Sequence, residues 1–151
     1  MKSEFEAFDA EAYAMADALD ELTGAIKDVE KGLRVRLFKM RTKTAILQEE
    51  GESDRHYLLW AKHDTVGWAL HVLTRPEDGE ERNTLIVSAP WRLRLRATAC
   101  FEALLVQAAL DIRSRNKDVQ EAITRCEAFT KKISETKPLA SNGSGIGRAT
   151  T

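Results

Sequence analysis

Three histidines in the middle of the sequence are the first residues that could do acid–base or metal chemistry. His56 and His71 fall in two segments that we expect to be neighbouring strands, where both could lie diagonally on one sheet face. Together with Trp68 they outline a candidate pocket. A zinc site needs three or four ligands, and no cysteine or carboxylate is spaced to complete one. We therefore interpret them as ordinary strand histidines and predict no metal and no cofactor.

Two other pairs of reactive side chains lack the neighbouring residues that catalysis or a disulfide framework would need. His63 directly precedes Asp64, which offers acid–base chemistry, but no nucleophile with a recognisable neighbourhood accompanies the pair. Cys100 and Cys126 both fall in helix-like sequence. Two thiols do not make a disulfide framework, so we interpret them as small buried hydrophobic residues.

Aromatic residues gather in the same central part of the chain. A stacking platform for bases or a ligand is one interpretation of their rings. At period-two spacing on adjacent strands, however, such rings more often belong to a core or to a cross-strand pair. We favour the structural interpretation, with one or two ring edges reaching a groove. The residues are Tyr57, Trp60, Trp68 and Trp91.

Two basic segments are the strongest candidates for contact with an anion or with nucleic acid. One is a run without an intervening acid, and the other lies at the start of a predicted helix, where positive charge opposes the helix dipole. Phosphate is one counter-charge for such clusters, and an acidic part of the protein is the other. The first segment contains Arg34, Arg36, Lys39, Arg41 and Lys43, and the second contains Arg92, Arg94 and Arg96.

The N-terminal segment predicts a long helix of opposite charge. Apolar residues recur at alternating steps of three and four from Phe5 to Leu33, which is the a/d seam of an amphipathic or coiled-coil helix. Ser3 followed by Glu6 is a capping-box arrangement. Residues 2–31 hold nine acidic residues against three lysines, a net charge of −6. We expect this helix to neutralise the basic segments, within the chain or across two subunits.

The length of this helix also predicts an oligomer. At 1.5 Å per residue, nearly thirty residues span roughly 40 Å, whereas a nine-residue strand spans about 30 Å. Part of the seam then overhangs the sheet, and exposed apolar seams usually find a partner. We expect a homodimer whose interface uses Phe5, Phe8, Met15, Leu19, Leu22 and Ile26.

Beyond Gly32, a natural helix stop, the apolar period changes to two and predicts strands. The first strand needs a β-bulge between Leu37 and Phe38 to keep its apolar residues on one face. Tight turns join the strands into an antiparallel meander, and its two acidic turns, EEGESD and PEDGEE, fall at the same end. Both faces of the middle strands are apolar, so helices or a second subunit must cover each. The predicted strands are 33–41, which KTAILQ at 43–48 could extend, then 56–63, 66–74 and 83–89.

Helical periodicity returns after Pro90 and continues to Ile133. The segment is either one helix of about 45 residues or a hairpin that turns near Ser114–Asn116, where Ser and Asn could cap a new helix. We favour the hairpin, in which Cys100 would lie opposite Cys126.

Composition sets the class of protein. Hydrophobic residues make up 43% of the chain, charged residues 31%, and the net charge is −1, a globular balance without a global field for nucleic acid or membrane. We expect no secretory signal and no membrane span, hence a cytoplasmic protein. We predict one α+β domain at residues 1–136, with a long N-terminal helix, a four-stranded antiparallel meander and one long or two antiparallel C-terminal helices, followed by a disordered tail at 137–151.

The predicted function follows mainly from missing chemistry. Without a convergent nucleophile, base, metal set or cofactor loop, the sequence favours a non-catalytic protein-interaction or adaptor module, a homodimer with an unknown protein partner. The alternative is a nucleic-acid or polyanion binder that uses the basic strand 34–43 with Arg92, Arg94 and Arg96, although the acidic turns and the near-zero net charge count against it. A third hypothesis is an enzyme with a pocket near His56, Trp68 and His71.

Overall fold

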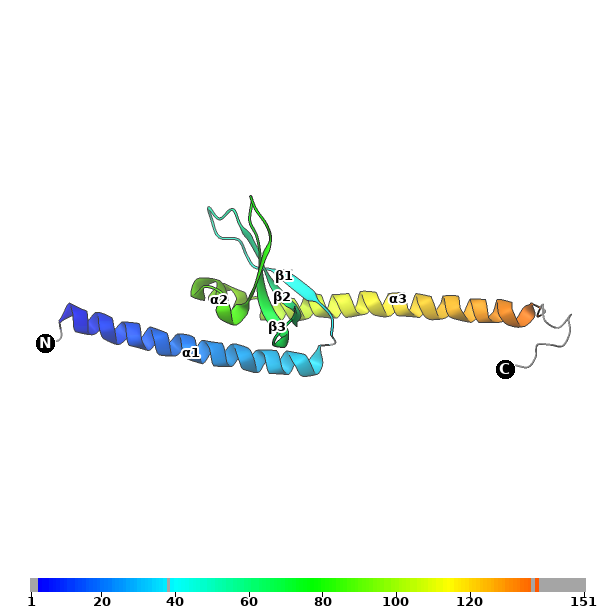
Figure 1. The fold of residues 1–151 in the computed structure, drawn as a ribbon, viewed down its shortest axis with the longest axis horizontal. Coiled ribbons are helices and arrows are strands. Elements are labelled where there is room, and N and C mark those ends of the chain that lie inside the picture. The colour runs from blue at the N-terminus through cyan, green and yellow to red at the C-terminus, as the bar shows by residue number, and fades with distance from the viewer. Residues whose placement is uncertain (1–2, 38, 137, 139–151) are drawn as a thin grey trace. The chain divides into compact units, whose positions relative to one another are not determined.

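The computed structural model describes residues 3–37, 39–136 and 138. It has an α+β fold with the predicted order of a long helix, a four-stranded antiparallel sheet and C-terminal helices (Figure 1). The elements are α1 (Glu4–Arg36), β1 (Thr42–Ala45), β2 (Arg55–His63), β3 (Gly67–Arg75), β4 (Arg82–Leu85), the 3-10 helix η1 (Ile86–Ser88), α2 (Trp91–Thr98) and α3 (Phe101–Glu135).

Helix α1 begins where the sequence predicts but ends later. Ser3 is its N-cap, and the Ser3 side chain accepts a hydrogen bond from the backbone N–H of Glu6. The helix continues through Gly32 to Arg36, so the strand predicted at 33–41 is wrong, and β1 forms instead where KTAILQ was expected to extend it. Gly32 costs a helix about 1 kcal/mol, whereas burial of Leu33 contributes roughly 1.5–3 kcal/mol, so burial decides the outcome. The predicted bulge disappears with the strand, and Phe38 lies outside the described residues.

The sheet has the order β1-β2-β3-β4, with every neighbouring pair antiparallel. Strands β2 and β3 form the predicted hairpin, in which His56 is opposite Thr74 and His63 is opposite Gly67. Gly67 has φ +79°, a left-handed conformation that glycine adopts without strain at the tight turn. The two acidic turns lie at the end of the sheet opposite this hairpin turn, as predicted.

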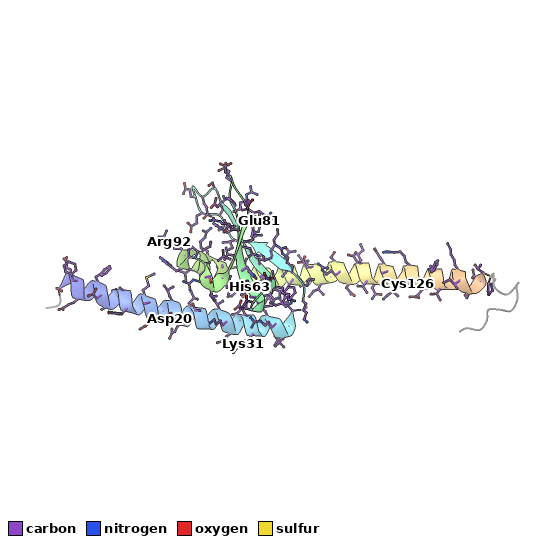
Figure 2. The ribbon with its side chains drawn as sticks, viewed as in Figure 1. Asp20, Lys31, His63, Glu81, Arg92 and Cys126 are labelled. Carbon is purple, nitrogen blue, oxygen red and sulfur yellow. The ribbon has the colours of Figure 1, made fainter. Side chains whose placement is uncertain are left out.

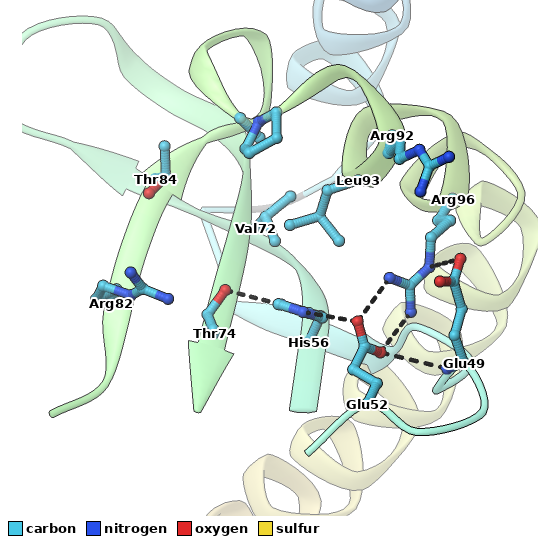
Figure 3. A pocket seen from close by; sticks show the side chains of 12 residues that line it. Glu49, Glu52, His56, Val72, Thr74, Arg82, Thr84, Arg92, Leu93 and Arg96 are labelled. Carbon is cyan, nitrogen blue, oxygen red and sulfur yellow. Dashed lines mark hydrogen bonds and ion pairs between the residues drawn. The ribbon is translucent and has the colours of Figure 1, made fainter. Parts of the chain in front are cut away.

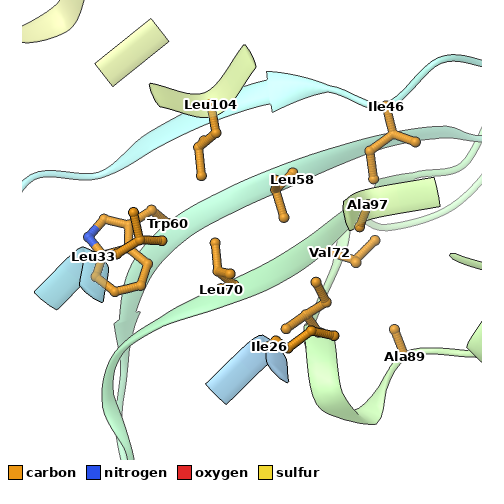
Figure 4. Close-up of a cluster of buried hydrophobic side chains, with 11 residues drawn as sticks. Ile26, Leu33, Ile46, Leu58, Trp60, Leu70, Val72, Ala89, Ala97 and Leu104 are labelled. Atoms are coloured by element: carbon orange, nitrogen blue, oxygen red, sulfur yellow. The ribbon is translucent and has the colours of Figure 1, made fainter. Parts of the chain in front are cut away.

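The helices cover one face of the sheet. Leu58, Trp60, Leu70 and Val72 share that face because they alternate along β2 and β3 in register. Figure 4 shows them packed with residues from three helices. The helical contributions are Ile26 and Leu33 of α1, Ala97 of α2 and Leu104 of α3.

A smaller buried cluster occupies the other face. It consists of Leu59, Ala61 and Leu73, with Tyr57 packed against it. All four residues belong to β2 and β3, and the cations of Lys43 and Arg75 lie over the Tyr57 ring. The sheet's own side chains therefore pack over this face.

Helix α3 is unbroken, so the predicted hairpin at Ser114–Asn116 is wrong. Residues 101–135 contain no Gly or Pro, and Ser or Asn costs a helix interior well under about 1 kcal/mol. The helical segment breaks instead between α2 and α3, where the N–H of Cys100 bonds to the Ala97 carbonyl in a tight turn. With the hairpin gone, the reason to expect Cys100 opposite Cys126 is gone too.

The chain divides after Leu110 into two compact units. The first contains α1, the sheet, η1, α2 and the first turns of α3, and the second contains the remainder of α3. Within the described residues, no helix is both long and apolar enough to cross a membrane. The tail predicted at 137–151 lies, except for Pro138, outside the described part of the chain.

Candidate functional site

The end of the sheet that carries the acidic turns holds a connected polar network (Figure 3). Arg96 of α2 donates two hydrogen bonds to the carboxylate of Glu52, from Nη1 at 2.9 Å and from Nη2 at 2.8 Å. Arg96 Nη2 also donates to the Leu47 carbonyl at 2.7 Å, and Arg96 Nε lies 3.4 Å from Oε1 of Glu49. The hydrogen bonds from Arg96 lower the pKa of Glu52 to about 2. Arg96 therefore ties the loop between β1 and β2 to α2.

His56 extends this network into the sheet. Its Nε2 lies 3.4 Å from Oε2 of Glu52, and its Nδ1 is hydrogen-bonded to Oγ1 of Thr74 at 2.8 Å. These side chains line a pocket of about 430 Å³. The lining includes the hydroxyl side chains of Thr74 and Thr84, and Glu52 is held by Arg96. Through Arg96 and His56 the network therefore ties the loop between β1 and β2 to α2 and to the sheet.

A smaller pocket of about 260 Å³, here called the tryptophan pocket, lies at the opposite end of the sheet. The rings of Trp60 and Trp68 stack there with centroids 6.2 Å apart and planes at 30°. Arg34, in the last turn of α1, donates from Nε to the Trp68 carbonyl at 2.8 Å. The pocket is lined by Arg34, Leu37, Lys39, Trp60, Val66, Gly67 and Trp68.

Trp60 supplies an unusual donor to this pocket. Its side chain is only 1% exposed, and its indole N–H has no hydrogen-bond partner in the described part of the chain. A buried donor without a partner costs about 1–3 kcal/mol, and such groups are rare in folded proteins. The sequence placed Trp60 and Trp68 in an aromatic group and Arg34 and Lys39 in a basic segment, and the structure brings members of both groups to one pocket.

The structure does not bring together the three residues predicted to form a pocket. His56 lies beside Thr74 at one end of the sheet and Trp68 beside Lys62 at the other. His71 points to the opposite face, where its Nδ1 is 3.0 Å from the Ala69 carbonyl. Burial lowers the pKa of His71. Among the described residues, no group of three or more His, Cys, Asp or Glu side chains could hold a metal ion.

The two basic segments lie at opposite ends of the sheet. Arg34 belongs to the tryptophan pocket and Arg96 to the Glu52 network. Arg94 donates to Oγ1 of Thr23 at 3.1 Å, and Arg92 lies over the ring of Trp91. Arg36, Lys39 and Arg41 are exposed around the end of α1 and the start of β1, so residues 34–43 are not one basic strand.

Within the chain, helix α1 does not supply the counter-charge that the sequence predicted; the alternative, pairing across two subunits, stays a prediction. The acids that pair with Arg96 come from the loop between β1 and β2. Across residues 3–37 and 39–136, no ion pair involves an acid of α1. Glu30, in the second half of α1, is buried and accepts a hydrogen bond from the Leu70 N–H at 2.7 Å. It does so because β4 ends opposite His71, which leaves the Leu70 N–H without a strand partner.

The residues predicted as an interface divide into two groups. Ile26 is in the core, and Leu19 and Leu22 are half-buried. Phe5, Phe8 and Met15 are 82%, 70% and 43% exposed, and every residue from 4 to 18, here called the free half of α1, is exposed. Figure 2 shows the side chains along this helix. Residues 4–21 carry seven acids and no base.

The second unit, taken by itself, carries another exposed apolar stripe. Val119, Ile123 and Ile133 recur at helical spacing along α3 and are all exposed, as is the thiol-bearing Cys126. Residues 111–135 carry six basic and five acidic side chains. This stripe is therefore nearly neutral, unlike the free half of α1.

Comparisons of this chain with protein-family models, with curated proteins and with solved structures found no match. Its function is therefore inferred from the surfaces and pockets described above.

Proposed function

We propose that this chain is a protein-interaction module whose free half of α1 binds a basic amphipathic helix of a partner protein. The observation that supports the proposal most strongly is the exposure of Phe5 and Phe8 on a helix whose later seam residues are buried. Both belong to the same a/d repeat as Ile26 and Leu33. Side chains at this spacing pack between the residues of a facing helix.

The charges beside the seam favour a basic partner. With Phe5 and Phe8 at a and d, Glu4 and Glu11 occupy g positions and Asp9 an e position, which face a partner's e and g residues. A second copy of the free half would set Glu4 against Asp9, like charge against like. A helix with Lys or Arg at these positions would gain favourable pairs instead. Self-pairing of the free half is therefore the less favourable arrangement.

A peptide titration tests this proposal. The full chain would be titrated by calorimetry with a synthetic heptad helix that has Leu at a and d and Lys at e and g, beside the same peptide with Glu at e and g. We expect binding of the Lys peptide only, weakening as salt rises. The double variant Phe5→Gln/Phe8→Gln should bind at least about tenfold more weakly, because burial of one Phe contributes roughly 1.5–3 kcal/mol.

The matched control is Ala10→Gln, which lies at the f position of the same heptad, away from the seam. It should bind as the wild type does. Equal binding of the Lys and Glu peptides, or unchanged binding by the double Phe variant, would contradict the proposal.

Self-association is proposed for the second unit instead. The stripe of Val119, Ile123 and Ile133 is exposed, and its nearly balanced charges do not oppose pairing with a second copy. We expect light scattering after size exclusion to give a dimer at micromolar concentration. Ile123→Gln/Ile133→Gln should give a monomer, while Ala128→Gln, on another side of α3, should not. A monomeric wild type would rule out the homodimer.

A further inference from the structure

We propose that the tryptophan pocket binds a small aromatic anion, a single ring that carries a carboxylate or phosphate group. The pocket lies entirely in the first unit, between the C-terminal end of α1 and the turn that joins β2 to β3. It includes no residue of the free half of α1, so this proposal is independent of peptide binding.

The indole N–H of Trp60 is the first observation. The Trp60 side chain lines the pocket and is 1% exposed, yet its Nε1 has no partner among the residues that the structure describes. Figure 4 shows this nitrogen on the side of the ring turned away from Leu58 and Leu70, toward the edge of the core. Because the nitrogen itself is buried, a carboxylate or phosphate oxygen would accept this bond once the lining side chains shift apart to admit it.

The positive charge of the pocket lining also favours an anionic ligand. Arg34 and Lys39 are both in the pocket wall, and no acid lines it. The bond from Arg34 Nε to the Trp68 carbonyl fixes the guanidinium at the wall. Its Nη1 and Nη2 make no hydrogen bond within the described ranges. The C-terminal end of α1 carries a partial negative charge, which disfavours an anion nearby. That partial charge is only about half an elementary charge, whereas Arg34 and Lys39 each carry a full positive charge.

The aromatic surface and the size of the pocket favour a ligand with a single planar ring beside its anionic group. Trp68 is only half-buried, so the part of its ring not covered by Trp60 is available to a second planar group. A volume of about 260 Å³ is below the roughly 300–1,000 Å³ usual for drug-sized ligands. One ring with its anionic group fits this space better than a nucleotide or a peptide.

The pocket at the other end of the sheet differs from the tryptophan pocket in that its polar side chains are paired with one another. Arg96 there is neutralised by Glu52 and Glu49, and His56 is bonded to Thr74. At the tryptophan pocket, no acid is among the described lining residues, and no described residue accepts a bond from the buried Trp60 N–H.

Indole resonances in nitrogen–proton NMR spectra would test the proposal directly. The full chain has three tryptophans, and Trp60→Phe would assign the Trp60 signal by its loss. The probes are benzoate, phenyl phosphate, inorganic phosphate and benzyl alcohol at equal ionic strength. We expect at least one aryl anion to move the Trp60 proton downfield and to saturate, with inorganic phosphate and benzyl alcohol at least about tenfold weaker.

Three results would overturn the proposal. The Trp60 signal could fail to move with either aryl anion up to millimolar concentration. It could respond equally to benzyl alcohol, which would mean an apolar site without anion recognition. It could respond equally to inorganic phosphate, which would mean a site for charge alone. The affinities measured for benzoate and for phenyl phosphate show whether the pocket prefers a carboxylate or a phosphate group.

Two variants separate the donor from the cation. Trp60→Phe keeps an aromatic six-membered ring but removes the five-membered ring with its N–H, and intrinsic fluorescence of the remaining Trp68 and Trp91 should show at least about tenfold weaker binding. Lys39→Gln should weaken binding about two- to fivefold, the range of one exposed ion pair. The control Lys31→Gln changes an exposed lysine of α1 that does not line the pocket. If Trp60→Phe fails to fold, wild-type binding by Lys39→Gln still contradicts the proposal.

Discussion

The two halves of α1 share one apolar repeat but have opposite surroundings. In the second half, Ile26 and Leu33 are buried against the sheet, and in the first, Phe5 and Phe8 stand in solvent. The charges differ as well, with seven acids and no base in residues 4–21, and two acids with four bases in residues 22–36. A periodic apolar seam thus predicts a helix, but only the position of the sheet decides which part of the seam is core and which part is left for a partner.

The largest expected difference between the halves is in the free energy of unfolding. Ile26→Ala should cost about 2–5 kcal/mol, because it opens a cavity in a closely packed core. Phe8→Ala should change stability by less than about 0.5 kcal/mol, because the side chain is 70% exposed. Urea denaturation of the full-length variants measures both. Similar losses would mean that the free half is covered in solution.

The burial of the Glu30 side chain provides a second, smaller contrast between the two halves. Glu30→Ala should cost about 1–3 kcal/mol, because the Leu70 N–H loses its acceptor inside the core. Glu30→Gln keeps a side-chain oxygen and should lose less. The matched change in the free half, Glu11→Ala, should be nearly neutral, since Glu11 is exposed. We expect this order in urea denaturation, whereas equal losses for Glu30→Ala and Glu11→Ala would mean that the hydrogen bond from Leu70 to Glu30 does not stabilise the core.

Glu52, the acid paired with Arg96, should make the free energy of unfolding depend on pH, whereas the acids of the free half of α1 should not. Glu52 titrates at about 2 in the folded chain instead of its ordinary 4.5, so its contribution is complete above pH 4.5 and is lost as pH falls toward 2. We expect about 1–2 kcal/mol after allowance for solvent screening. The gap in stability between wild type and Glu52→Gln should therefore narrow below pH 4.5, as urea unfolding at several pH values would show. A constant gap would mean that the ion pair contributes nothing.

Local signals were enough to predict much of the fold. The Ser3 cap, the hairpin of β2 and β3 and the antiparallel order follow from capping chemistry and period-two alternation, which act over a few residues. The end of α1 did not, because Gly32 is a local stop signal that burial of Leu33 outweighs. The break after Thr98 has no Gly or Pro to mark it.

The site was harder to predict because its partners are far apart in sequence. Arg96 and Glu52 are 44 residues apart, and only the packing of α2 beside the loop brings them together. The sequence showed the acidic turn EEGESD, but no residue in that turn indicated that Arg96 would be its partner. The tryptophan pocket was missed for a related reason, since placing Arg34 in a strand removed it from the end of α1 that faces Trp68.

Amide hydrogen exchange along α1, with and without the Lys heptad peptide, tests the central claim most directly. In the chain alone, residues 4–18 should exchange rapidly while residues 22–33 are protected by the sheet. Addition of the Lys peptide should slow exchange in residues 4–18, and the Glu peptide should leave it unchanged. Protection of residues 4–18 without peptide, or no protection with the Lys peptide, would contradict the assignment of this half of α1 as the partner-binding surface.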